Sequence, residues 1–361
     1  MEFSKKVFII AEAGVNHNGS LELALKMVDA ASSMGVDAIK FQTFSADRIV
    51  TKTAPKAEYQ EKSLGKNGSQ YEMIKKLELS RDDHIKLKAA CDRKGVEFMS
   101  TPFDSESVDL LADIIDVARL KIPSGEITNP LLLLKMAEKG KPMIMSTGMA
   151  TMSEVETALA LLAFGLLKSK AEPSMSAFKE AYFSKEGLSI LKEKVSLLHC
   201  TTEYPASYED TNLQAIKTLK HAFGLEVGLS DHTPGIYISI AAVARGSTII
   251  EKHFTLDRNL PGPDHKASLE PNELQELVRG IRAVEKAIGS GIKVPASSEI
   301  KNSLVARKSL VALKEIPAGT EFSRENLGVK RPGTGLSPMR FWDLLGKKAS
   351  KKYFPDEMIN E

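Results

Sequence analysis

Two histidines in separate stretches of the chain have the type and surroundings of metal ligands. His232 closes the apolar run in GLSDHTPG (residues 228–235), and His253 closes the run in TIIEKHF (residues 248–254). Each run predicts a β-strand, and the IYISIAAVARG segment between them predicts a helix. In a parallel sheet this unit brings both imidazoles to one edge. Because two protein ligands leave positions open for water or substrate, we expect a catalytic divalent metal site there.

The elements that must position these histidines follow a regular pattern. Short β-like runs alternate with helical patterns from about residue 7 to residue 288, and we count eight strand–helix pairs. Eight such pairs predict a (β/α)8 TIM barrel, in which the chemistry lies on the loops at the carboxyl ends of the strands. An open doubly wound sheet is the alternative fold. The polar stretch that runs to about residue 79 is expected to be a long loop that covers the site.

The expected strand ends carry polar side chains of three chemical kinds. Cations and hydroxyls suit a small ligand with a phosphate and a carboxylate: Lys40, Lys121, Thr101, Ser124, Ser146 and Ser230. Other groups suit hydrogen bonds to a polyhydroxylated partner: Gln42, Glu126, Tyr204 and Asp264. Glu12 is a candidate to hold the metal directly or through water. A phosphate ligand, a Lewis acid and a sugar together indicate a condensation.

The chain divides into a large and a small domain. We expect a catalytic barrel at 1–288, a Gly-, Ser- and Pro-rich linker at 289–303 and a small β-like domain at 304–361. A domain of this size has little core of its own, so we expect it to pack on another surface. It contains Arg331 in KRPGTG, a cation able to reach a neighbouring site.

Composition excludes several classes of function. The 361 residues carry a formal charge of +2 without a basic tract, which argues against a nucleic-acid partner. No apolar stretch is long enough to span a bilayer and no signal peptide is apparent, so we expect no membrane partner. The two cysteines, Cys91 and Cys200, form no metal or redox motif and are typical of a reducing cytoplasm.

A series of motifs in the same order resembles the bacterial sialic acid (N-acetylneuraminate) synthases. The motifs include AEAGVNHNG, KFQTF, STPFD, KIPSGE, STGMA, HCTTEYP, GLSDH, EKHFTLD and PGPDHKASLEP, and the tail resembles the antifreeze-like (SAF) domain of these enzymes. The HCTTEYP motif and the long region 164–194 are also similar to legionaminate synthases. Thr334 stands in KRPGTG where the family commonly has Asn.

The resemblance implies a transferase that condenses phosphoenolpyruvate with N-acetylmannosamine and water to give N-acetylneuraminate and phosphate. The alternative product is N,N'-diacetyllegionaminate, made from 2,4-diacetamido-2,4,6-trideoxy-mannose. The implied cofactor is a divalent metal, Mn²⁺ before Mg²⁺ or Co²⁺, on His232 and His253, and the implied assembly is a domain-swapped homodimer. The implied phosphoenolpyruvate contacts are Lys40, Thr101, Lys121, Ser124, Ser146, Thr202 and Ser230. The implied sugar contacts are Gln42, Glu126, Tyr204, Asp264 and Arg331 from the other subunit.

For the mechanism we expect the metal to polarise the sugar aldehyde, with Glu12 and Glu126 as candidates for handling water and protons. Two other functions remain open. A Schiff-base aldolase would use Lys121 or Lys252 and no metal. A carbohydrate- or ice-binding protein would use the tail as its functional module and the barrel as a scaffold.

Overall fold

The computed structural model describes residues 6–57, 60–61 and 67–361 and contains a parallel eight-stranded sheet. Every hydrogen-bonded pair in this sheet is parallel, in the order β3-β2-β1-β8-β7-β6-β5-β4, and β3 and β4 lie beside each other where the ring closes. The strands are β1 Phe8–Gly14, β2 Ala38–Thr43, β3 Glu97–Pro102, β4 Leu120–Ile122, β5 Met143–Ser146, β6 Val195–Cys200, β7 Glu226–Asp231 and β8 Ile249–His253. The predicted TIM barrel is confirmed.

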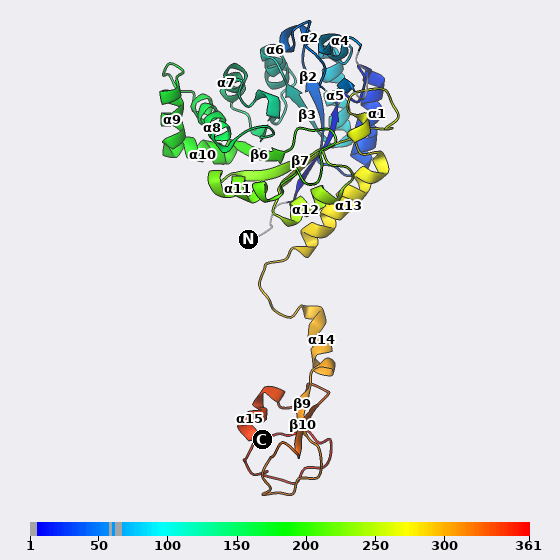
Figure 1. The fold of residues 1–361 in the computed structure, drawn as a ribbon, viewed down its shortest axis with the longest axis vertical. Coiled ribbons are helices and arrows are strands. Elements are labelled where there is room, and N and C mark those ends of the chain that lie inside the picture. Colours follow the sequence, from blue (N-terminus) through cyan, green and yellow to red (C-terminus); the bar gives the residue numbers. More distant parts are fainter. Residues whose placement is uncertain (1–5, 58–59, 62–66) are drawn as a thin grey trace. The chain divides into compact units, whose positions relative to one another are not determined.

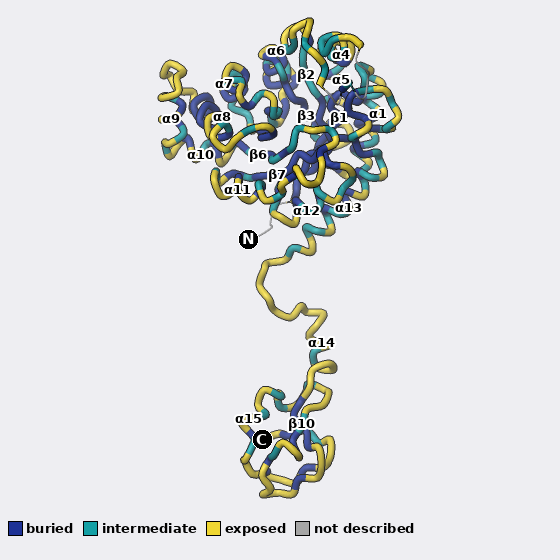
Figure 2. The backbone as a smooth tube through the Cα atoms, viewed as in Figure 1, coloured by how far each residue is buried: buried dark blue, intermediate teal, exposed yellow. Residues whose placement is uncertain are grey.

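Helices surround the strands, and their buried faces form the outer layer of the core (Figures 1 and 2). Ser20 is the N-cap of helix α1, and its side chain accepts a hydrogen bond from the Leu23 backbone N–H. The helices that follow successive strands are α1 Leu21–Ser33, α5 Arg81–Lys94, α6 Ser105–Asp109, α7 Pro130–Glu138, α8 Met152–Leu166, α11 Gln214–Phe223, α12 Tyr237–Ala244 and α13 Pro271–Ala287.

Two regions differ from the predicted element pattern. The connection from β2 to α5, expected to be a loop, contains the short helices α2 Ala46–Ile49 and α4 Gln70–Lys75. Ser69 and Glu72 form a capping box at the start of α4, a local signal that the polar composition of this stretch obscured. The helical pattern of residues 153–194 predicts one long helical region, but the structure has three helices there, α8, α9 Met175–Phe183 and α10 Lys185–Lys194. The additional pair α9 and α10 packs against α8.

The chain divides into two compact units, Met1–Ser290 and Gly291–Glu361. The second unit holds helix α14 Ser297–Ala306, which begins inside the expected linker and extends past its end at residue 303. Strands β9 Ser309–Ala312 and β10 Leu327–Lys330 pair antiparallel over a small core that includes Phe322 and Tyr353. Among the described residues, no helix combines the length and the apolar character needed to cross a membrane.

Candidate active site

The interior of the barrel is apolar at one level and polar at the next. Six small or apolar side chains of the strands form a cluster inside the ring: Ile10, Ala38, Met99, Ile144, Leu198 and Ile249. Side chains two residues apart on a strand point to the same face. The residue two positions further on is polar in five of these strands, Glu12, Lys40, Thr101, Ser146 and Glu251, and is the thiol Cys200 in β6. The strands therefore place a polar layer at the carboxyl end of the barrel.

Lys40 connects the carboxylates on one side of this layer. Its Nζ lies 2.7 Å from Glu12 Oε2 and 3.7 Å from Glu251 Oε2, and it donates a 3.0 Å hydrogen bond to Thr101 Oγ1. Burial alone would lower the pKa of Lys40, but the two carboxylates outweigh it and raise the pKa. Burial and the neighbouring Glu251 raise the pKa of Glu12 to about 7 even though Lys40 opposes the shift.

Lys121 is a second buried cation, on the opposite side of Glu251. Its Nζ donates a 2.5 Å hydrogen bond to Ser146 Oγ, and its distance to Glu251 Oε1 is 3.9 Å. Burial lowers the pKa of Lys121, and the attraction to the Glu251 carboxylate offsets this effect only in part. Glu251 accepts a 3.0 Å hydrogen bond from Ser230 Oγ. A buried ammonium group with incomplete compensation is suited to bind an anionic ligand.

Gly148 brings two hydroxyls together next to Lys121's strand. Its backbone N–H donates a 3.0 Å hydrogen bond to Ser124 Oγ, which also lies 3.0 Å from Cys200 Sγ. A Cβ at Gly148 would lie 2.3 Å from Thr202 Oγ1 and 2.8 Å from Ser124 Oγ, so only glycine fits between them. Thr202 Oγ1 is buried without a hydrogen-bond partner within the described ranges. This hydroxyl is therefore available to a ligand.

The two histidines meet as predicted, with ring centroids 5.5 Å apart. The Nδ1 atom of His232 is 2.6 Å from the Thr201 carbonyl oxygen, which leaves Nε2 with a 3.5 Å contact to Ser230 Oγ. The buried Nδ1 of His253 has no hydrogen-bond partner in the part of the chain that the structure describes. Burial lowers the pKa of both rings, for His253 well below its ordinary value with help from His232 and Lys40. Both imidazoles are therefore neutral near pH 7.

These two neutral rings fit a divalent metal. The Thr201 carbonyl fixes the tautomer of His232, as an outer partner of a metal-bound histidine does. Glu12 Oε1 and His253 Cε1 would lie 3.3 and 3.6 Å from a Cβ at Gly14, so both side chains face this glycine. Residues 6–57, 60–61 and 67–361 contain no group of three or more His, Cys, Asp or Glu that could hold a metal. The remaining ligands would come from water or substrate.

Three of the expected sugar residues line a cavity of about 220 Å³ next to His253. Its polar wall includes Gln42, Tyr204 and Asp264. The ring of Tyr204 lies over that of His232, with centroids 4.2 Å apart, and meets His253 edge-on at 5.5 Å. Burial raises the pKa of the Asp264 carboxyl to about 6. The structure therefore brings three of the five expected sugar contacts together beside the histidines.

The other two expected sugar contacts are not joined to this cavity. Glu126 lies in the 3₁₀ turn Ser124–Glu126 that follows β4, and its carboxylate accepts a 2.7 Å hydrogen bond from Asn129 Nδ2. Arg331 belongs to the second unit, where its Nε donates a 3.0 Å hydrogen bond to the Ala306 carbonyl oxygen. The assignments of these two residues remain predictions.

Two residues of β8 correct the sequence analysis. Lys252 was expected at the functional edge, but it occupies the outer face and pairs with Asp231 at 3.0 Å. Glu251, which was not singled out, lies inside the barrel between the two lysines. Strict alternation in IIEKH places Glu251 on the same face as His253 and Lys252 on the other, so the period of two was the signal that could have found it.

The chain matches two family models, the NeuB family over residues 27–293 and the SAF domain over residues 307–361. It is 49% identical to the N,N'-diacetyllegionaminic acid synthase of Campylobacter jejuni, over 99% of this chain and 100% of that one. It is 45% identical to the enzyme of the same name from Legionella pneumophila, over 96% of this chain and 91% of that one.

A solved structure with the same fold is the N-acetylneuraminic acid synthetase of Leptospira borgpetersenii in complex with citrate. The TM-score is 0.66 at 37% identity, and the match covers 82% of this chain and 90% of that one. The NeuB match covers well over half of the chain, and the histidine pair and every residue of the polar layer except Glu12 lie within it, as the tail does within the SAF match. The chain therefore belongs to the NeuB family of nonulosonate synthases, enzymes that condense phosphoenolpyruvate with a sugar.

Proposed function

We propose that this protein is an N,N'-diacetyllegionaminate synthase. It condenses phosphoenolpyruvate with 2,4-diacetamido-2,4,6-trideoxy-mannose and water, and it releases phosphate by cleavage of the C2–O bond. The observation that carries the condensation is the pair of neutral imidazoles, 5.5 Å apart, beside the buried cations Lys40 and Lys121. The two imidazoles are suited to bind a divalent metal, and the two lysines are suited to bind an anion.

The choice of sugar is supported by the relatives. The two legionaminic acid synthases at 49% and 45% identity match almost the whole chain. N-acetylneuraminate synthase, the main expectation from the sequence, becomes the second candidate because of the 37% identical Leptospira enzyme. Both candidates use the same reaction and differ in the sugar.

The residues of this chain divide the work of the reaction. Lys121, Ser146, Ser124 and Thr202 bind the phosphate and carboxylate of phosphoenolpyruvate, together with Lys40, Thr101 and Ser230 at the other end of the layer. A divalent metal, most simply Mn²⁺ with Mg²⁺ or Co²⁺ as alternatives, would be held by His232 and His253 and would supply Lewis acidity to the sugar aldehyde.

Carbon–carbon bond formation joins C3 of phosphoenolpyruvate to the aldehyde carbon, and water then adds at C2. Glu12, whose pKa of about 7 lets it exchange a proton near neutral pH, is suited to orient and deprotonate this water. Glu126 is the second candidate to handle a proton at the sugar. With H₂¹⁸O as solvent, the label should enter the sugar acid and not the phosphate, and label in the phosphate would exclude this route.

We also propose a domain-swapped homodimer in which Arg331 of one subunit contacts the sugar in the barrel of the other. The cytoplasm is the proposed location, supported by two buried cysteines that form no disulfide. Mixing His253→Ala and Arg331→Ala proteins tests the swap, because each mixed dimer would contain one site with both native residues. Recovery of activity on subunit exchange is expected, and a monomer by sedimentation would contradict the proposal.

The test of the function is phosphate release from phosphoenolpyruvate by metal-stripped protein after addition of Mn²⁺. N-acetylmannosamine and the diacetamido-trideoxy sugar are compared in parallel. We expect release that depends on both metal and sugar, with higher kcat/KM for the diacetamido sugar. Preference for N-acetylmannosamine would favour the second candidate, and full activity in EDTA would contradict the metal assignment.

A further inference from the structure

The cavity beside His253 has two chemically different walls. Its polar residues, Gln42, Tyr204, His253 and Asp264, come from the barrel strands and the loops directly after them. Most of the remaining lining is apolar and comes from the segments that follow β2 and β3: Phe44, Ile49, Met73, Ile74, Leu77 and Phe103. Val15 and Pro263 are also apolar, and Gln60 is polar. One cavity therefore presents hydrogen-bonding groups near the histidines and mainly hydrocarbon elsewhere.

The apolar wall is built from side chains that support one another. The rings of Phe44 and Phe103 pack edge-to-face, with centroids 6.2 Å apart. Gln60, a polar residue of the same connection, accepts a 2.9 Å hydrogen bond at Oε1 from the Ala57 backbone N–H. A ligand hydroxyl on this side would lose its water and find mainly hydrocarbon in return.

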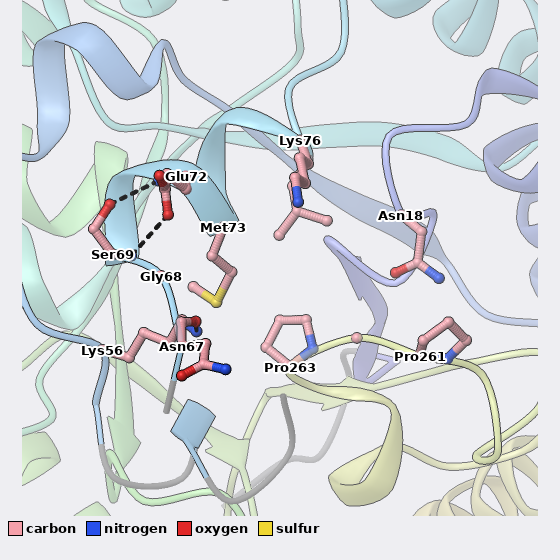
Figure 3. A pocket seen from close by; sticks show the side chains of 12 residues that line it. Asn18, Lys56, Asn67, Gly68, Ser69, Glu72, Met73, Lys76, Pro261 and Pro263 are labelled. Atoms are coloured by element: carbon pink, nitrogen blue, oxygen red, sulfur yellow. Dashed lines mark hydrogen bonds between the residues drawn. The ribbon is translucent and has the colours of Figure 1, made fainter. Parts of the chain in front are cut away.

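A neighbouring cavity of about 390 Å³ shares the lining residues Met73, Leu77 and Pro263. Its other lining includes polar and charged groups such as Asn18 and Lys76, and the sulfur end of Met73 points into it (Figure 3). Glu72 also lines it, with its carboxylate held by the backbone N–H of Ser69 at 3.0 Å. Met73 and Leu77 thus lie between the two cavities, and the charged groups Lys76 and Glu72 line only the cavity away from the histidines.

We propose that this apolar wall selects a sugar that lacks its terminal hydroxyl, by receiving the C6 methyl group of a 6-deoxy substrate. The inference rests on the proposed function, since it assumes that the aldehyde end of the sugar lies at His232 and His253. The polar wall then faces the hydroxyl-bearing carbons, and the far end of the chain lies against hydrocarbon. A hydroxymethyl group in the same place would be desolvated without a partner, whereas a methyl group gains from burial.

The direct test compares two sugars that differ at one atom, 2,4-diacetamido-2,4,6-trideoxy-mannose and its 6-hydroxy counterpart. Phosphate release from phosphoenolpyruvate is measured with the native Mn²⁺-loaded protein. We expect kcat/KM to be about 10- to 100-fold lower for the 6-hydroxy sugar, the discrimination that an apolar pocket gives against an added hydroxyl. Equal kcat/KM values would overturn the inference and leave the proposed function intact.

A matched pair of substitutions at Ile74 tests the wall itself. Ile74→Thr and Ile74→Val remove the same carbon and have nearly the same shape, but only threonine adds a hydroxyl. In Ile74→Thr the preference for the 6-deoxy sugar should shrink by about 3- to 10-fold, the value of one new hydrogen bond. Ile74→Val, which shortens the side chain but keeps the wall apolar, is the reference for this change, and identical ratios in the two variants would contradict the assignment.

Failure of the proposed function has a different signature. If neither diacetamido sugar supports phosphate release, the function and the inference both fall. If N-acetylmannosamine is the better substrate, N-acetylmannosamine and its 6-deoxy analogue are compared instead. Preference for the deoxy analogue would still support the wall, and preference for the 6-hydroxy form would exclude it. The sugar comparison with native protein needs no variant to fold.

Discussion

The inner and outer faces of strands β7 and β8 both carry buried charged side chains, but the charges are closely paired only on the outer face. On the outer face, Asp231 accepts hydrogen bonds from Thr233 and from Ser239 Oγ at 2.6 Å, and Lys252 pairs with Asp231 while donating to the Thr233 carbonyl oxygen. Every charge there has a close partner. The inner face instead holds Glu251, whose nearest ammonium nitrogens are 3.7 and 3.9 Å away.

On the same inner face, the buried Nδ1 of His253 has no hydrogen-bond partner among the described residues. A buried polar group without a partner costs free energy, so a fold retains one where a ligand will complete it. The closely paired Asp231 and Lys252, in contrast, stabilise the fold and leave no group for a ligand. The comparison teaches that burial and charge alone do not distinguish a functional group from a structural one, whereas several incompletely paired groups gathered in one layer do.

The strongest test removes an inner histidine. In His253→Ala, bound Mn²⁺ should fall and kcat/KM should drop on the order of 10³-fold, because the Lewis acid that stabilises transition-state charge is lost. Metal analysis and phosphate release measure both. Unchanged Mn²⁺ affinity would show that the inner histidines are not ligands.

The outer pair should affect stability instead. Lys252→Met leaves the Asp231 carboxylate buried and unpaired, which should lower the free energy of unfolding of the barrel by about 3–5 kcal/mol. Urea denaturation of metal-free protein measures this loss. The double variant Asp231→Asn/Lys252→Met should recover most of it, and kcat/KM of the folded, metal-loaded protein should change little.

Two serines on opposite faces provide a smaller contrast. Ser146→Ala removes the hydroxyl that accepts from Lys121 Nζ, so KM for phosphoenolpyruvate should rise about 10- to 100-fold. Ser100, whose hydroxyl is 2.6 Å from Thr43 Oγ1 on the outer face, is the control. Ser100→Ala should leave KM unchanged and cost about 1 kcal/mol of stability; equal effects on KM would remove the distinction between the faces.

His17 sharpens the comparison because it is a buried histidine outside the polar layer, packed near Phe41. Its Nδ1 accepts a 3.0 Å hydrogen bond from the Gly19 backbone N–H, and its Nε2 has no hydrogen-bond partner within the described residues. Burial, with help from His84, lowers the pKa of His17 from 6.5 to about 4 in the folded protein. As pH falls below 6.5, His17 is therefore protonated in the unfolded chain before it is protonated in the folded one. The stability that neutral His17 preserves is therefore lost between pH 6.5 and 4. From pH 7.5 to 5.5, wild type should lose about 1.4 kcal/mol more than His17→Gln. Identical losses would contradict the shift.

Much of the site was predictable because strand ends in a barrel converge. The sequence placed His232 and His253 after consecutive strands, and a parallel sheet permits only one edge for both. The same reasoning joined Lys40 to Thr101 and Lys121 to Ser146. It was wrong for Lys252, because side chains alternate between the two faces of β8, so that Glu251 and His253 point inward and Lys252 points outward.

The linear order of apolar and polar runs determined the barrel, the small tail domain and the identity of most polar groups at the rim. Only the tertiary structure decided which charged groups have a close partner of opposite charge. Pairing depends on the exact distance between side-chain atoms of residues that are far apart in sequence. Glu251 lies between lysines from β2 and β4, and Ile74 of α4 reaches the same cavity as Phe103 after β3. Such contacts arise when eight strands close into a ring, and no local pattern encodes them.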